Sequence, residues 1–224
     1  MPSSTRIINF QQYFFNKGGN KPRWHLASTK MNKVICVYSA SSCNIDQSYF
    51  TAAAELGKAI ALRGDTLLFG GGLNGLMGAT AKAVHKHRGQ VIGVIPKALN
   101  VKGVVYETCD ELIVTEGMRE RKAVMDARSD AFIALPGGFG TLEELLEIIT
   151  LKQLKYHNKP VVILNINGFY DRLLLQFEEI FSQKFAKPES KKLYYVTNNP
   201  TAALEYIDTY QPMVIKEKWL TDVT

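Results

Sequence analysis

Short apolar runs alternate with helical patterns along most of the chain, and this alternation constrains the fold more than any other feature. The strand-like runs lie at 33–40, 66–70, 90–96, 111–115, 130–136, 159–166 and 194–197. Apolar residues recur at helical spacing at 48–63, 76–89, 118–129, 141–154, 169–185 and 200–207. Strands separated by helices of crossover length form parallel sheets covered on both faces. We therefore expect a single α/β domain with a Rossmann-like parallel sheet and helices on both faces.

The positive charge is concentrated at the N-terminus. Residues 1–30 contain five basic side chains and no acidic one, whereas the remainder carries 22 basic against 21 acidic residues. A nearly neutral body argues against binding along a nucleic-acid backbone. We expect an N-terminal extension at 1–30, a Rossmann-like body at 31–210 and a C-terminal tail at 211–224.

The extension at 1–30 has two interpretations. It lacks regular apolar periodicity, so it is either a disordered segment upstream of a start at Met31 or an organelle-targeting peptide, since such peptides are basic and poor in acidic residues. We expect a cytoplasmic protein, with organelle targeting as the alternative.

Composition also limits the kinds of site. No apolar run reaches the roughly 20 residues that a membrane helix needs, so we expect a soluble protein with no membrane partner. The three cysteines show no CxxC spacing, which gives no support for a zinc site or a disulfide framework. The four histidines lie in the extension, at an exposed helix end and in a polar loop, so none is predicted to be a general base.

The first glycine-rich loop follows a strand and opens a helix. Gly70, Gly72 and Gly75 match the GxGxxG pattern of dinucleotide-binding proteins. A NAD site also needs an acidic residue about 20 positions later, but no Asp or Glu lies between Asp65 and Glu107. The alternative is that the glycines only permit a tight turn.

The second glycine-rich loop, PGGFGTLEE at 136–144, combines an anion site with a carboxylate. Its glycines let backbone N–H groups converge on a phosphate at a helix start. Thr141 and Glu144 also have the T-x-x-E spacing of a capping box, in which Glu144 would bond back to the backbone. A carboxylate beside a phosphate repels it, so a second role for Glu144 would need another chemical reason.

The helix before this loop begins MRERK and carries Arg121 and Lys122. A pair between Lys122 and Asp126 on a solvated helix face is the simplest interpretation. Because open α/β sheets bind ligands at the carboxyl edge of their strands, the start of this helix can also lie beside the 136–144 loop.

Four motifs in this order resemble one family. GGGLNGLMG, VIGVIP, MRERK and PGGFGTLEE are similar to those of the Lonely Guy (LOG) family, whose members are often labelled lysine decarboxylases. The likeness extends over 34–207, and the RK and PGGxGTxxE motifs together are specific.

The resemblance implies hydrolysis of the N-glycosidic bond of a nucleoside 5′-monophosphate, either a cytokinin riboside 5′-monophosphate or AMP. It implies Arg121 and Glu144 as catalytic residues and a homodimer without metal or redox cofactor. The substrate contacts that it implies are Lys122, Gly138, Phe139, Gly140, Thr141, Leu142, Glu143 and Thr150.

This chemistry explains the carboxylate. Breaking a ribosyl C–N bond builds positive charge on the sugar, which a nearby anion stabilises while backbone amides hold the phosphate. Two alternatives stay open: a broader purine or pyrimidine nucleotide nucleosidase, and a non-catalytic carrier of a nucleotide or of the molybdenum cofactor on the same fold.

Overall fold

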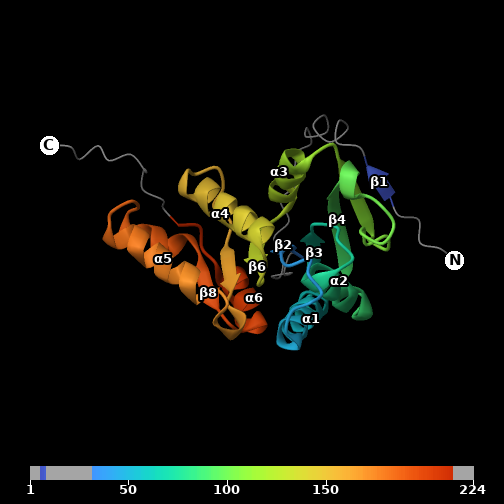
Figure 1. Ribbon diagram of the computed structural model, residues 1–224, viewed down its shortest axis with the longest axis horizontal. Coiled ribbons are helices and arrows are strands. Elements are labelled where there is room, and N and C mark those ends of the chain that lie inside the picture. Colours follow the sequence, from blue (N-terminus) through green and yellow to red (C-terminus); the bar gives the residue numbers. More distant parts are fainter. Residues whose placement is uncertain (1–5, 9–31, 214–224) are drawn as a thin grey trace, which may run out of the picture.

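The computed structural model describes residues 6–8 and 32–213 (Figure 1). Its centre is an eight-stranded sheet in the order β1-β5-β4-β3-β2-β6-β7-β8, in which all neighbours pair in parallel. The strands are β1 (Arg6–Ile8), β2 (Val34–Tyr38), β3 (Thr66–Phe69), β4 (Gln90–Pro96), β5 (Glu111–Thr115), β6 (Ala131–Ala134), β7 (Val161–Leu164) and β8 (Tyr195–Thr197). The expected Rossmann-like α/β fold is confirmed.

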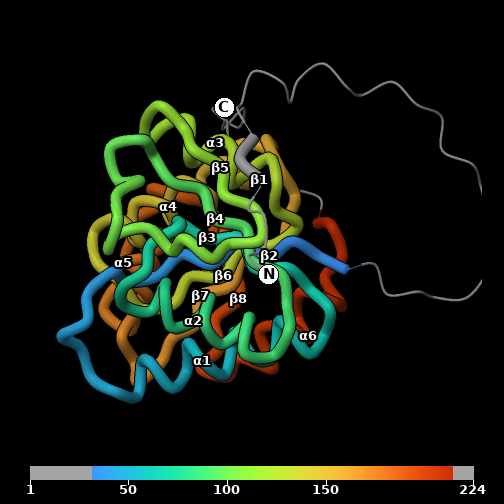
Figure 2. Tube along the Cα trace, turned by 90° about the vertical axis from the view of Figure 1, so that its right-hand side faces the viewer, coloured from blue at the N-terminus to red at the C-terminus, as the bar shows by residue number. Residues whose placement is uncertain are grey.

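Helices cover both faces of the sheet. They are α1 (Gln47–Leu62), α2 (Gly75–Lys86), α3 (Met118–Arg128), α4 (Phe139–Gln153), α5 (Asp171–Ser182) and α6 (Pro200–Thr209), with short 3-10 turns at Lys97–Leu99, Ile166–Gly168 and Pro188–Leu193. Figures 1 and 2 show α1, α2 and α6 below the strands and α3 and α4 above them. None of these described helices is long and apolar enough to cross a membrane.

Alternate residues of the strands fill two separate cores. In β2, Ile35 and Val37 pack with residues of α1, α2 and α6, whereas Cys36 and Tyr38 pack with residues of α3, α4 and α5. A strand buried on both sides needs apolar residues at every position. This requirement explains why VICVY, AFIAL and VVIL are continuous apolar runs.

Most element boundaries agree with the sequence pattern, with two differences. The helix expected from Thr141 begins two residues earlier, at Phe139. The segment Arg6–Ile8, inside the expected N-terminal extension, forms the edge strand β1 beside β5. Three residues are too few for a recognisable strand pattern, so the sequence did not predict it. The expectations for 1–5, 9–31 and 214–224 lie outside the described residues.

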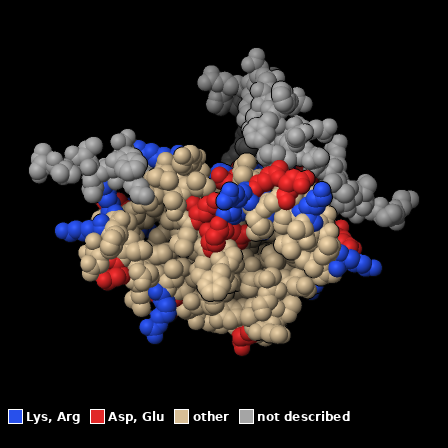
Figure 3. Space-filling model, turned by 45° about the horizontal axis from the view of Figure 1, so that its top comes forward, with Lys and Arg blue, Asp and Glu red and all other residues tan. Residues whose placement is uncertain are grey.

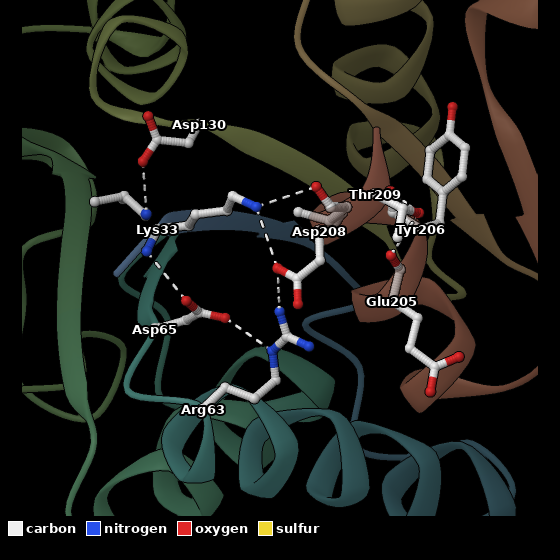
Figure 4. A network of polar contacts seen from close by, with 10 residues as sticks. Lys33, Arg63, Asp65, Asp130, Glu205, Tyr206, Asp208 and Thr209 are labelled. Atoms are coloured by element: carbon white, nitrogen blue, oxygen red, sulfur yellow. Dashed lines mark hydrogen bonds and ion pairs between the residues drawn. The ribbon is translucent and has the colours of Figure 1, made fainter. Parts of the chain in front are cut away.

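A polar network joins the amino ends of the central strands to two helices (Figure 4). The Lys33 backbone N–H donates to Asp65 Oδ1 at 3.0 Å, and Arg63 Nε donates to Asp65 Oδ2 at 2.9 Å. Lys33 Nζ and Arg63 Nη2 both lie beside Asp208 Oδ1, at 3.1 and 2.6 Å. The network therefore ties the start of β2 to the end of α1 and to α6, at the edge of the sheet opposite the strand ends that carry the glycine loops.

Lys152 is an unusual buried cation on α4. Its side chain is fully buried, and its Nζ has no hydrogen-bond partner in the described part of the chain. The amine lies 4.6 Å from the centre of the Tyr210 ring, which is a cation–π contact. Burial lowers the pKa of Lys152 to about 8, because a charged amine is poorly solvated there.

We expect this burial to make stability depend on pH. In the folded protein the Lys152 amine loses its proton above about pH 8, whereas in the unfolded chain it keeps the proton up to its ordinary pKa of 10.5. Because the unfolded chain binds more protons in between, the free energy of unfolding rises as pH increases from about 8 to 10.5. Lys152→Met should remove this dependence on pH, and it should raise the free energy of unfolding at pH 7 by about 2–3 kcal/mol because no charged amine is then buried. Urea denaturation across this pH range measures the difference. Lys58→Met on the exposed face of α1 is the control; equal curves for wild type and Lys152→Met would contradict the expectation.

Candidate functional site

The site lies where the strand order reverses. β2 has β3 on one side and β6 on the other, so the connections after β2 and β6 turn away from each other. Open α/β sheets bind ligands at such switch points, outside the carboxyl ends of the strands. The two connections touch here, because the Ala40 N–H donates to the Pro136 carbonyl at 3.2 Å.

Arg121 enters this region from the start of α3 and is held by several groups. Its side chain is buried, with only 8% exposed. Nε donates to the carbonyl of Val94 in β4 at 3.0 Å, and Nη1 donates to Glu144 Oε1 at 2.7 Å. Both contacts use the fixed planar geometry of the guanidinium, so the position of Arg121 is well determined.

Gly70, the first glycine of the GGG loop, makes room for this guanidinium. A Cβ at Gly70 would lie 2.1 Å from Arg121 Nη2. Any larger residue would therefore displace the arginine. This role of Gly70 was not predicted from the sequence, although three successive glycines signal a close approach of some other group.

Glu144 points into the site. α4 has Gly138 as its N-cap and starts at Phe139, so Thr141 is the third helical residue and does not cap the helix. Glu144 as a whole is 7% exposed, and its carboxylate bonds to Arg121 and not back to the helix backbone. The capping-box interpretation is therefore wrong, because the helix begins too early for this spacing to close a cap.

The electrostatic setting of Glu144 combines burial with a strong partner. Burial raises the pKa of Glu144 above its ordinary value, and the adjacent Arg121 guanidinium lowers it. The charge of Glu143 raises this pKa further, and that of Lys122 lowers it. Because burial is the largest of these effects, the Glu144 carboxylate is more basic than an exposed glutamate.

The start of α4 offers backbone donors beside this pair. The first bond across the cap runs from Leu142 N–H to Gly138 O at 3.0 Å, which leaves the preceding three N–H groups without an acceptor in the helix. Gly138, Phe139 and Gly140 are exposed. A Cβ at Gly137 would lie 2.1 Å from Thr141 Oγ1, so the buried threonine packs over this glycine. The arrangement suits an anion at the helix start.

Lys122 has acidic partners from the neighbouring helix. Its Nζ pairs with Glu143 and, at 2.9 Å, with Glu147, both on α4. The pair expected between Lys122 and Asp126 does not form; Asp126 pairs instead with Lys159 at 2.9 Å. Figure 3 shows acidic and basic side chains gathered in the middle of this side of the molecule.

Two of the predicted substrate contacts, Leu142 and Thr150, contact other parts of the protein. Leu142 is half-buried and packs against the core on the α3–α5 side. Thr150 lies on an exposed part of α4, where its hydroxyl donates to the Leu146 carbonyl at 2.7 Å. Six positions separate it from Glu144, which places it about 120° around the helix. Within one chain, therefore, Thr150 faces away from the Arg121–Glu144 pair.

The first glycine loop does not resemble a dinucleotide site. Both Leu76 N–H and Met77 N–H, at the start of α2, donate to the Ala40 carbonyl, at 2.9 and 3.3 Å. Gly75 has a φ of 62°, and a Cβ there would lie 2.5 Å from Ala40 O. These amides are therefore occupied by the chain itself, and the glycines serve the turn and its close contacts.

His157 is engaged in the interior of the protein and lies outside the Arg121–Glu144 pair. His157 is buried, its Nε2 donates to the Ile148 carbonyl at 2.9 Å, and its Nδ1 accepts from the Lys159 N–H at 3.2 Å. Both ring nitrogens are therefore engaged by the backbone. Over residues 6–8 and 32–213, no group of three or more His, Cys, Asp or Glu side chains is arranged to hold a metal ion.

Comparison with known proteins identifies the family. The sequence profile of the family described as "Possible lysine decarboxylase" matches residues 77–207. The cytokinin riboside 5′-monophosphate phosphoribohydrolase LOG of Oryza sativa subsp. japonica is 46% identical over 183 residues, covering 79% of this chain and 75% of the relative. The corresponding LOG5 protein of Arabidopsis thaliana is 40% identical over 191 residues, 84% of each chain. This chain belongs to the LOG family.

Solved structures of proteins with other names share this fold. The molybdenum cofactor binding protein of Rippkaea orientalis aligns with a TM-score of 0.62 at 26% identity, covering 81% of this chain and 98% of that one. The molybdenum cofactor carrier protein of Chlamydomonas reinhardtii aligns with a TM-score of 0.60 at 24% identity, covering 79% and 98%. The LOG family therefore shares its fold with carrier proteins, so the fold alone does not identify the function.

The charges around Glu144 give a direct test of this geometry. We expect Glu143→Gln to lower the pKa of Glu144, because a repelling negative charge is removed, and Lys122→Met to raise it, because an attracting positive charge is removed. Titration of the Glu144 carboxyl carbon by NMR measures both. Glu120→Gln at the start of α3 is the control, and shifts of the same sign in the two variants would contradict the arrangement.

Proposed function

We propose that this chain is a nucleotide phosphoribohydrolase. It hydrolyses the N-glycosidic bond of a nucleoside 5′-monophosphate, a cytokinin riboside 5′-monophosphate or AMP, to the free base and ribose 5-phosphate. The observation that carries the proposal is the buried contact of 2.7 Å between Arg121 and Glu144 beside the open amides of α4. The LOG relatives, which are named as cytokinin riboside 5′-monophosphate phosphoribohydrolases, support the same reaction.

Each part of the site has a role in this reaction. The exposed start of α4, from Gly138 to Gly140, holds the 5′-phosphate with backbone N–H groups. Glu144 then lies beside the ribose, where it stabilises the positive charge that develops at C1′ or orients the attacking water. The bond from C1′ to the base breaks, the bond from C1′ to the water oxygen forms, and the departing base takes up a proton.

Arg121 has two functions in this scheme. It favours the ionised form of Glu144, since its guanidinium lowers the pKa of that carboxyl, which burial raises. Its remaining N–H groups face Gly70 and are available to the sugar or phosphate. Lys122, which is paired with Glu143 and Glu147, contributes to the charge balance and reaches a ligand only by leaving those partners.

A carrier of nucleotides or of molybdenum cofactor is the main alternative, because solved carriers share the fold. The Arg121–Glu144 pair favours an enzyme. A buried carboxylate next to an anion-binding helix start weakens the binding of a phosphate and has a purpose only when positive charge develops nearby. A broader purine or pyrimidine nucleotide nucleosidase would use the same residues.

Substrate choice tests the phosphate anchor. We expect free base to be released from AMP or isopentenyladenosine monophosphate and not from the matching nucleosides, because the nucleosides lack the group that the α4 amides hold. Chromatography of the products measures this release. Equal turnover of nucleoside and monophosphate would contradict the anchor, and release from CMP would favour the broader nucleosidase.

Removing either charge of the pair should abolish most of the activity. We expect Glu144→Gln or Arg121→Ala to lower kcat by roughly 10² to 10⁴-fold, since each removes a positioned charge. The matched controls are Glu147→Gln on α4 and Arg119→Ala on α3, which should retain activity. A folded Glu144→Gln protein with full kcat would show that this carboxylate takes no part in the reaction.

We also propose that the chain acts as a homodimer through the outer face of α4. Phe139, Leu146 and Leu154 are 92%, 40% and 38% exposed, and they recur on one side of the helix. An exposed apolar stripe of this kind is typical of a protein interface. Thr150 lies on the same side, so the substrate contact predicted for it would be made in the partner's site.

A charge in the stripe should disrupt this dimer. We expect Leu146→Glu to convert the dimer to a folded monomer, because the carboxylate would be buried without a partner at the interface. Light scattering coupled to size-exclusion chromatography measures the mass. Leu62→Glu, at the end of α1 and 68% exposed in the wild type, is the control. A wild-type protein that is monomeric at all concentrations would contradict the proposal.

A further inference from the structure

Three polar side chains form a line outside the site described above. His85, in the last turn of α2, has its Nδ1 2.9 Å from the Tyr106 hydroxyl and its Nε2 3.0 Å from Asp110 Oδ2. Tyr106 and Asp110 belong to the connection between β4 and β5. Neither of these two hydrogen bonds reaches Arg121 or Glu144, so the three side chains do not extend that pair.

The directions of the hydrogen bonds follow from Asp110. Its Oδ2 also accepts from the Val91 N–H at 2.8 Å, so an ionised Asp110 can only accept from His85. When the imidazole is neutral, its proton therefore lies on Nε2, and Nδ1 accepts from the Tyr106 hydroxyl. These hydrogen bonds thus hold the Tyr106 hydroxyl against the end of α2.

The Tyr106 ring is held on two further sides. It stacks on the His85 ring with centroids 5.6 Å apart, and it meets Phe69 at the end of β3 edge-on at 6.1 Å. Only 7% of Tyr106 is exposed. With the ring and the hydroxyl both fixed, the backbone of Tyr106 has little freedom to move.

That backbone is bonded to the first glycine loop. The Tyr106 N–H donates to the Gly71 carbonyl at 2.8 Å, and the Leu73 N–H donates to the Val104 carbonyl at 2.8 Å. Between these bonds, Gly72 and Val105 form an antiparallel bridge. The connection at 104–106 therefore holds the turn at 71–73, whose Gly71 has a φ of 72° and no side chain of its own to anchor it.

The residue before this turn lies against the arginine. Gly70 immediately precedes the turn, and its backbone approaches Arg121 so closely that a Cβ would lie 2.1 Å from Nη2. On its other side the guanidinium is bonded to Val94 of β4. A shift of residues 70–73 would therefore change the space in which the Arg121 guanidinium lies.

We propose that His85 and Tyr106 are positioning residues for the reaction: through the 70–73 turn they hold Arg121 in its place beside Glu144. The inference rests on the proposed function for its kinetic consequence, although the positioning itself is a property of the structure. Asp110 acts through His85 by keeping the proton on Nε2.

Tyr106→Phe is the sharpest variant, because it removes the hydroxyl and keeps the ring and the backbone bond to Gly71. We expect faster amide hydrogen exchange at 71–73 and a changed NMR signal of the Arg121 Nε–H. We expect kcat to fall about tenfold, since a misplaced catalytic group costs up to about 10²-fold. KM for the monophosphate should change less than kcat, because the α4 amides, which hold most of the phosphate, are untouched.

A double-mutant cycle separates one shared contact from two independent effects. His85→Phe keeps an aromatic ring for stacking and removes both nitrogens. If His85 and Tyr106 act through their hydrogen bond, the double variant His85→Phe/Tyr106→Phe should lose no more kcat than either single variant. His87→Phe is the control, because His87 Nδ1 bonds to Ala83 O within its own helix.

Several results would overturn the proposal. They are an unchanged exchange rate at 71–73, an unchanged Arg121 Nε–H signal, an unchanged kcat in folded Tyr106→Phe, or additive losses in the cycle. A loss of activity that only follows the unfolded fraction in thermal melts would overturn it too. If the wild type releases base from no nucleotide, the proposed function fails, and the exchange rate and the Arg121 signal still decide the positioning.

Discussion

All strands of the sheet run in the same direction, so every connection from a strand to the next helix begins at the same edge. The reversal of strand order between β2 and β6 opens that edge in the middle. Helix α3 begins after β5 and crosses the sheet to β6, so its first turn passes the end of β4. Arg121 and Glu144 thus meet at one point, although they are far apart along the chain.

Burying each of these two charged side chains alone would destabilise the folded protein. A buried arginine or carboxylate without a partner destabilises a protein by about 3–5 kcal/mol, because water no longer solvates it. Here the Val94 carbonyl, the absence of a side chain at Gly70 and the bond between the two groups offset this cost. In the proposed reaction the pair has a chemical role, and the open backbone amides at the start of α4 suit the phosphate of the substrate.

The sequence predicted the fold better than the contacts between the charged side chains. The apolar runs at β2, β6 and β7 correctly predicted central strands, because a strand covered on both faces has no tolerance for polar residues. The sequence left open whether the GxGxxG loop binds a dinucleotide or only forms a tight turn. The structure favours the turn, because two amides at the start of α2 donate to the carbonyl of Ala40, which is distant in sequence. Edge strand β1 and the role of Gly70 were missed, since three residues and a single glycine carry no periodic signal.

The sequence by itself determined that parallel strands alternate with helices and that an arginine helix precedes a glycine-rich helix start, because periodicity and turn residues are local properties. Only the tertiary structure decided where the charged side chains point. Glu144 turns to Arg121 instead of capping α4, and Lys122 pairs with Glu143 and Glu147 instead of Asp126. These ion pairs depend on which faces of α3 and α4 lie against each other. Residues about 20 positions apart become neighbours only when the sheet brings these two helices together.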